Sequence, residues 1–247
     1  MRKVFKVLFG ISVVLMSCSK SETSEIETVF DNNLCQAVNY YEDISQEYIE
    51  VIGVGHNEYL HSALEHFDWS ASNYEEELRL RFNLISNSRS SLIDSDLELD
   101  DSYDMEYLEK NLNDEVALAY IKDVIALLAR VESEDELEGE LKSIREYVTS
   151  DNECNQKAVV LVFIEVLKNS YSFWSNEGAE VLARRNTSRS IDKVKWTNVV
   201  ASDAVGAAGA FTGYGLLVVA TGPMGWGALC ATVAFSSAWS SGAAALM

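Results

Sequence analysis

Apolar residues recur at steps of three and four along most of this chain, which is the spacing of one face of an α-helix. The first stripe begins at Ile26, and we expect its helix to end near Gly53 and Gly55. Ser133, followed three residues later by Glu136, forms a capping box and marks the start of another helix. The helices predicted after the first one cover residues 57–67, 74–92, 116–131 and 137–148. The pattern predicts a mainly α fold with an acidic loop at residues 94–104.

One predicted helix, residues 158–174, is apolar on more than one face. Its main stripe comprises Ala158, Leu161, Ile164, Leu167, Tyr171 and Trp174. Val159, Val160, Val162 and Phe163 lie on other faces of the same helix. A helix that is hydrophobic all round is buried. We therefore expect this helix to lie at the centre of the fold and to stop near Gly178.

The last fifth of the chain differs sharply in composition from the rest. Asp203 is the last charged residue, and the tract that follows it holds eight of the 13 glycines. A turn signal at residues 222–225 separates two uncharged arms, each close to the length of a bilayer-spanning helix. Small residues at steps of four place a flat stripe on each arm: Gly209, Gly213, Gly227, Ala231, Ala234, Ala238 and Gly242. Because such stripes let two helices approach closely, we predict a Gly/Ala-rich hydrophobic helical hairpin at residues 199–247.

Two interpretations of this hairpin remain open. It can be the buried core of the same domain or a surface for a protein partner. Alternatively, its composition resembles the hydrophobic segments of some bacteriocins and contact-dependent toxins, and that resemblance implies insertion into a lipid bilayer. Glycine disfavours a helix by about 1 kcal/mol per residue relative to alanine. Close packing must offset this cost in either case.

The first residues have the order of a secretory signal. Arg2, Lys3 and Lys6 precede an uncharged apolar run at residues 7–16, and the small residue Ser17 follows it. The run is too short to span a hydrocarbon core of roughly 30 Å comfortably. We therefore expect this segment to direct export. The alternative is a buried apolar helix.

The sequence Leu15-Met16-Ser17-Cys18 resembles the lipobox of bacterial lipoproteins. The resemblance implies removal of residues 1–17, attachment of lipid to Cys18 and acylation of the new amino terminus. It also implies residence in a bacterial cell envelope, anchored to a membrane, with the periplasmic or surface face left open. An ordinary signal peptide with a chance cysteine is the alternative.

The charge balance limits the partners of this chain. The full chain of 247 residues has a formal charge of −20, and loss of the signal reduces its 19 basic residues to 16 against 39 acidic ones, a charge of −23. Such a surface argues against nucleic acid as a partner and against adsorption to anionic lipid by charge. The proposed organisation is a signal peptide (1–17), a tether (18–27), an acidic helical domain (28–183), a basic polar linker (184–198) and the hairpin (199–247).

Three further cysteines follow Cys18. Cys35 and Cys154 lie in polar parts of an exported chain and can form one disulfide, although two thiols alone are a thin pattern. Cys230 lies in the apolar tract, where a small buried side chain is its expected role.

No constellation of residues predicts catalysis, and we name no catalytic residue, metal ligand or cofactor. His56, His61 and His66 are five residues apart and so do not share a helix face, although His61 and Glu65 could hold one ion. We interpret all three as ordinary histidines on a polar helix edge. The acidic loop lacks the glycine and the final glutamate of a calcium-binding EF-hand at the required places. The sequence therefore favours a protein that is not an enzyme.

Overall fold

The computed structural model describes residues 44–88, 104–188, 196–219 and 224–246, and within these ranges every regular element is an α-helix. The helices are α3 (Gln46–Glu65), α4 (Tyr74–Ser88), α5 (Met105–Asn111), α6 (Glu115–Leu128), α7 (Glu134–Ser150), α8 (Lys157–Ser175), α9 (Glu177–Ser188), α10 (Trp196–Val219) and α11 (Met224–Leu246). The predicted mainly α fold is confirmed.

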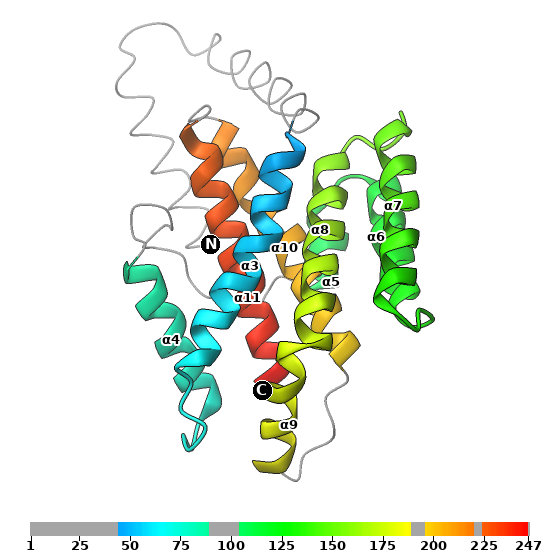
Figure 1. Cartoon of the computed structure of the whole chain (residues 1–247). Helices are drawn as coiled ribbons and strands as arrows, with labels where there is room; N and C mark the ends of the chain where they lie inside the picture. Colours follow the sequence, from blue (N-terminus) through cyan, green and yellow to red (C-terminus); the bar gives the residue numbers. More distant parts are fainter. Residues whose placement is uncertain (1–43, 89–103, 189–195, 220–223, 247) are drawn as a thin grey trace, which may run out of the picture. The chain divides into compact units, whose positions relative to one another are not determined.

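Four helices form the centre of the fold: α3, α8, α10 and α11 (Figure 1). They pack as a ring, with α3 against α8, α8 against α10, α10 against α11, and α11 back against α3. The C-terminal hairpin, α10 and α11, thus supplies two of the four central helices. Residues of all four helices belong to one hydrophobic core.

The remaining helices cover this ring. α4 packs against α3 and α11, and α7 packs against α8. α5 contacts α10, α6 contacts α8 and α7, and α9 contacts α8 and α11. The prediction that residues 158–174 form a central helix is confirmed, because α8 contacts five of the other helices and buries residues on several faces.

One carboxylate, Asp114, starts two of the helices. Its Oδ1 accepts hydrogen bonds from the backbone N–H groups of Val116 and Ala117 in the first turn of α6, both at 3.0 Å. Its Oδ2 accepts from the N–H groups of Asn155 and Gln156, immediately before α8, at 2.7 and 2.8 Å. Asp114 therefore fixes where the central helix begins relative to α6.

The capping box at the start of α7 is confirmed. Ser133 Oγ accepts from the N–H of Glu136 at 3.2 Å. The Glu136 carboxylate reaches back to the N–H of Glu132, at 2.9 Å, one residue before the usual partner. Two backbone donors at this helix end are thus satisfied.

Gly53 and Gly55 do not end a helix, contrary to expectation. α3 runs through both, and the separate helix predicted from residue 57 is its second half. A Cβ at Gly53 would overlap the side-chain amide of Asn169 in α8. A Cβ at Gly55 would lie 3.2 Å from that of Ala234 in α11. These glycines therefore allow close helix packing, and the part of the first predicted stripe before residue 44 lies outside the described residues.

The segment between the acidic helices and the hairpin is more helical than expected. α9 continues to Ser188, and α10 begins at Trp196, so both ends of the predicted linker 184–198 belong to helices. Arginine and serine occur in helices as well as in loops, so composition alone does not separate the two. Residues 94–103 of the predicted acidic loop and residues 222–223 of the predicted turn lie outside the described residues, whereas Met224 and Gly225, predicted as part of that turn, belong to α11.

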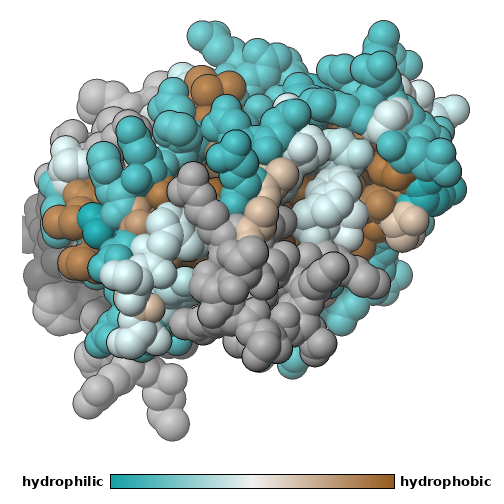
Figure 2. Space-filling model, turned by 60° about the horizontal axis from the view of Figure 1, so that its bottom comes forward, coloured by the Kyte–Doolittle hydropathy of each residue, from teal (hydrophilic) through white to brown (hydrophobic). Residues whose placement is uncertain are grey.

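The surface contrasts with this core. In the view of Figure 2, hydrophilic residues cover much of the described surface and hydrophobic residues lie in separate patches between them. Among the described residues, the large apolar side chains with the most exposure include Val51, Val54, Leu80, Leu84 and Tyr147. Exposed apolar residues in this number are normal for a folded domain and do not define a site.

Candidate functional site

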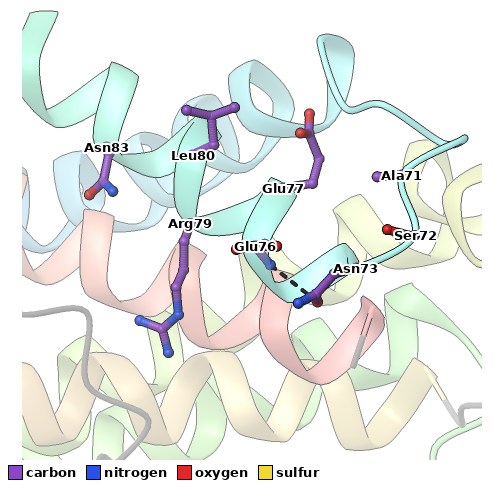
Figure 3. Close-up of a pocket in the computed structure, with 8 residues that line it drawn as sticks. All are labelled: Ala71, Ser72, Asn73, Glu76, Glu77, Arg79, Leu80 and Asn83. Carbon is purple, nitrogen blue, oxygen red and sulfur yellow. Dashed lines mark hydrogen bonds between the residues drawn. The ribbon is translucent and has the colours of Figure 1, made fainter.

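A shallow pocket on α4 has side chains that are largely committed to other partners (Figure 3). The Asn73 side chain accepts from the N–H groups of Glu75 and Glu76 and so caps α4. Arg79 pairs with Glu75 and lies over the ring of Trp239, with its guanidinium carbon 4.8 Å from the ring centroid. These groups stabilise the helix and do not converge on a ligand.

A stronger candidate lies inside the helical ring, around Asp203 of α10. This carboxylate is fully buried. Its Oδ2 accepts a short hydrogen bond from Ser170 Oγ and a second one, at 3.2 Å, from Trp174 Nε1, both on α8. Trp174 Nε1 also donates to Ser241 Oγ of α11 at 2.9 Å. One polar cluster thus joins both helices of the hairpin to α8.

His56 brings α3 into the same cluster. It is fully buried, and its Nε2 lies 3.3 Å from Asp203 Oδ2. The two atoms are close but are not aligned as a hydrogen bond, so the contact is mainly electrostatic. On the other side of the ring, Nδ1 lies 2.8 Å from Asn57 Oδ1.

The cluster continues through amides to the buried carboxylate of Glu165, which pairs with two partly exposed cations. Asn57 Nδ2 donates to the backbone carbonyl of Asn169 at 3.1 Å, and Asn169 Nδ2 donates to Glu165 Oε1 at 2.9 Å. Glu165 pairs with Arg145 of α7 at 2.5 Å and with Lys168 at 2.9 Å. We call this series of residues the polar chain; it links α7, α8, α3, α10 and α11.

The pKa values of the two carboxylates in the polar chain are shifted in opposite directions. Burial opposes ionisation of Glu165, but Lys168 and Arg145 outweigh it and hold the pKa of Glu165 below its usual value. Burial raises the pKa of Asp203 above its usual value, and the opposing effects of His56, Ser170 and Ser241 do not cancel the rise. Asp203 therefore holds a proton more readily than Glu165 does.

Serine, histidine and aspartate meet here, but not in the order that nucleophilic catalysis requires. In a catalytic triad the histidine lies between the other two and takes the serine proton. Here Ser170 donates to Asp203, and Asp203 lies between Ser170 and His56. All three side chains are fully buried. The geometry suits holding helices together.

The interpretation of the histidines as residues of a polar helix edge is wrong for His56. His61 and His66 are exposed, as expected, and His61 Nδ1 lies 3.3 Å from a carboxylate oxygen of Glu177. The recorded partner of His61 is thus Glu177 of α9 rather than Glu65. Within the described residues, no group of three or more His, Cys, Asp or Glu side chains could hold a metal.

The burial of His56 could have been predicted from its position in the helix, although histidine as a residue type does not suggest it. Ile49, Ile52, Tyr59 and Ala63 are all buried on α3, and His56 occupies the helical step between them. A polar residue in phase with an apolar stripe is buried, and a buried polar residue needs a partner. The identity of that partner, Asp203, could not be read from the sequence, because the two lie far apart in the chain.

The small residues of the hairpin divide into buried and exposed positions. Gly209, Ala234, Ala238 and Gly242 are buried, Ala231 is partly buried, and Gly213 and Gly227 are exposed. α10 also approaches α11 closely at Gly206, which the four-residue stripes did not include. A Cβ there would lie 2.8 Å from that of Ser240.

The side chains of Cys154 and Cys230 are buried, and no disulfide joins either one to another described residue. Burial raises the pKa of Cys154 to about 11 and that of Cys230 to about 12, so both are poor nucleophiles. The burial of Cys230 agrees with its expected role. Cys18 and Cys35 lie outside the described residues, so lipid attachment and a Cys35–Cys154 disulfide stay predictions.

One helical segment of the described residues, Trp226–Leu246, is long and apolar enough to cross a membrane by length and composition. In its most apolar 18-residue window, 78% of the residues are buried inside the protein. The core helix of a water-soluble protein has these same properties, so the segment does not by itself indicate a membrane location.

Comparison of the chain with protein-family models, curated proteins and solved structures finds no match.

Proposed function

We propose that this chain is a lipid-anchored, non-catalytic protein of a bacterial envelope that serves as a binding or scaffold protein, with its C-terminal hairpin as permanent core. The observation that carries the core assignment is the position of α10 and α11. They fill two of the four central places of the bundle, and the buried Asp203 bonds to α8 and faces His56 of α3. A hairpin held in this way is part of the fold.

The anchor and the surface complete the proposal. Lipid on Cys18 would hold the domain at a membrane, since acyl chains contribute about 0.8 kcal/mol per buried CH₂ and two or more chains anchor stably. The net charge of −23 after loss of the signal would keep the domain soluble beside that membrane. Partners would therefore meet an acidic surface such as the first turns of α4 and α7.

Deleting residues 199–247 from the mature, unlipidated chain tests the core assignment. We expect the truncated protein to lose its cooperative thermal transition, because α3 and α8 would each lose one of their two neighbours in the ring. Circular dichroism during heating provides the measurement. A truncated chain that still melts cooperatively near the temperature of the full protein would contradict the proposal.

A second candidate is a membrane-interacting, antagonistic effector that shields its hairpin until it reaches a target bilayer. The absence of charge after Asp203 and the bilayer-length segment Trp226–Leu246 favour it. The mature protein, added to dye-loaded lipid vesicles, would then release the dye. No leakage at a high protein-to-lipid ratio, with the hairpin still protected from protease, would contradict this candidate.

A further inference from the structure

The hairpin carries one charged residue, Asp203, and the structure places it opposite a buried histidine. Burying an isolated charge is costly, and a buried group usually changes its protonation state to avoid that cost. The number of protons shared by His56 and Asp203 therefore determines how well α10 docks.

Hydrogen bonding fixes one proton on the histidine ring. Asn57 Nδ2 donates to the carbonyl of Asn169, so Asn57 Oδ1 faces His56 and accepts from Nδ1. Nδ1 then carries a hydrogen in every state of the pair.

The other ring nitrogen requires a second proton at the contact with Asp203. If neither Nε2 nor Oδ2 held a proton, two lone pairs would face each other across 3.3 Å, and a carboxylate charge would lie buried without a counter-charge. With one proton on either atom, the pair has no net charge. The folded protein therefore favours one proton at this contact.

We propose that His56 and Asp203 form a proton-dependent latch that holds α10 against α3 and α8 most firmly in mildly acidic solution and loosens as the solution becomes alkaline. The latch is a property of the fold and does not depend on either candidate function. It acts through the docking of the hairpin.

The direction follows from proton counting between folded and unfolded chains. In an unfolded chain, aspartate and histidine have pKa values of about 3.9 and 6.5, so the two together hold one ionisable proton between these values. Above about pH 6.5 the unfolded chain loses that proton, whereas its release from the folded pair would leave the buried Asp203 carboxylate charged, so the proposed latch keeps its proton. Stability then falls as pH rises, because the folded state binds more protons.

Within the described part of the chain, the other groups recorded in contact with Asp203 do not titrate in this range. α8 contributes the hydroxyl of Ser170 and the indole of Trp174, and α11 contributes the hydroxyl of Ser241. α5 and α6 also pack against α10 but add no charged group to those that act on Asp203. Glu165, with Arg145 and Lys168, reaches His56 only through the two asparagines of the polar chain.

The test is hydrogen exchange of α10 in the full mature chain, followed by mass spectrometry between about pH 3.5 and 9. After correction for intrinsic exchange, the opening equilibrium constant should rise about tenfold per pH unit above about pH 7, since one proton is released. Asp203→Asn should abolish this alkaline rise, because no carboxylate remains to be charged. His61→Gln removes an exposed histidine and is the matched control, which should follow the wild-type profile.

His56→Gln should move the onset of the rise about 2.5 units lower, because Asp203 alone then retains a proton that unfolded aspartate releases near pH 3.9. A wild-type profile that stays level between pH 7 and 9 would overturn the latch, whether or not the variants fold. An Asp203→Asn profile that rises as steeply as the wild type would overturn it as well.

Discussion

Asp114 shows how much of this fold depends on one side chain. Its two oxygens accept from four backbone donors at the starts of α6 and α8. A single helix cap is worth about 0.5–2 kcal/mol. We expect Asp114→Ala to lower the free energy of unfolding by about 2–4 kcal/mol, because it removes two caps and leaves buried N–H groups unpaired. Urea denaturation measures this difference.

Asp104→Ala is the matched control for this prediction. Asp104 caps only the short helix α5, through one bond at 2.8 Å to the N–H of Tyr107. Its removal should cost about 1 kcal/mol. Equal effects of the two substitutions would show that Asp114 does not join two helix starts.

Single residues also show where sequence reasoning stopped. The capping role of Ser133 could be predicted, because a cap acts within one helical turn. The pairing of His56 with Asp203 could not, because it depends on how α3 and α10 are placed in space. The candidate site therefore emerged only with the structure, although its two ionisable residues stood out in different ways: one lay in phase with an apolar stripe, and the other was the last charge of the chain.

At the scale of helices, glycine has two opposite roles in the hairpin. Gly206 lies where α10 meets α11, and a Cβ there would come 2.5 Å from Ser240 Oγ and 2.8 Å from its Cβ. We expect Gly206→Ala to lower the free energy of unfolding by about 1–3 kcal/mol through this overlap. Gly227 faces open space, with no atom within 4 Å of an added Cβ. Gly227→Ala should raise the free energy of unfolding by about 0.5–1 kcal/mol, since alanine favours the helix.

Urea denaturation of the two glycine variants gives these values directly. In the Ser240→Gly background, Gly206→Ala should no longer lower the free energy of unfolding, because both overlapping atoms of Ser240 are then absent. Destabilisation by both single variants would contradict the assignment of Gly227 to an open position. A loss of stability that persists in the Ser240→Gly background would contradict the contact at Gly206.

The elements were predicted well where one helix face is apolar and poorly where glycine had to be interpreted. The stripe on α7 specifies its buried face directly, since Leu137, Leu141 and Val148 are buried, and the apolar residues on several faces of α8 specify its central position. Gly53 and Gly55 resemble helix ends in sequence, yet they lie inside α3 because α8 and α11 approach there. The residues around these glycines do not reveal that two other helices pack there. The predicted helix end was therefore wrong because it depends on tertiary contacts.

For the whole molecule, the sequence indicated that the tail is a hydrophobic hairpin but not what covers it. α10 and α11 have few charged residues because almost every face meets another helix, either from the ring or from the outer layer. The same composition would suit a bilayer. In the described bundle the hairpin is buried among other helices. If it stays buried, the predicted lipid on Cys18 would attach the molecule to a membrane.

This conclusion leads to a prediction about the intact protein in bacteria. Metabolic labelling with an alkyne-tagged fatty acid should label the wild-type chain. A variant whose first 18 residues are replaced by a conventional cleavable signal should lose the label and move from the membrane to the soluble fraction. The reason is that the acidic surface does not adsorb to anionic lipid and the hairpin is buried.

Cys35→Ala, with the native signal, is the control and should keep both label and location. An unlabelled variant that stays in the membrane after an alkaline carbonate wash would show instead that the hairpin itself inserts.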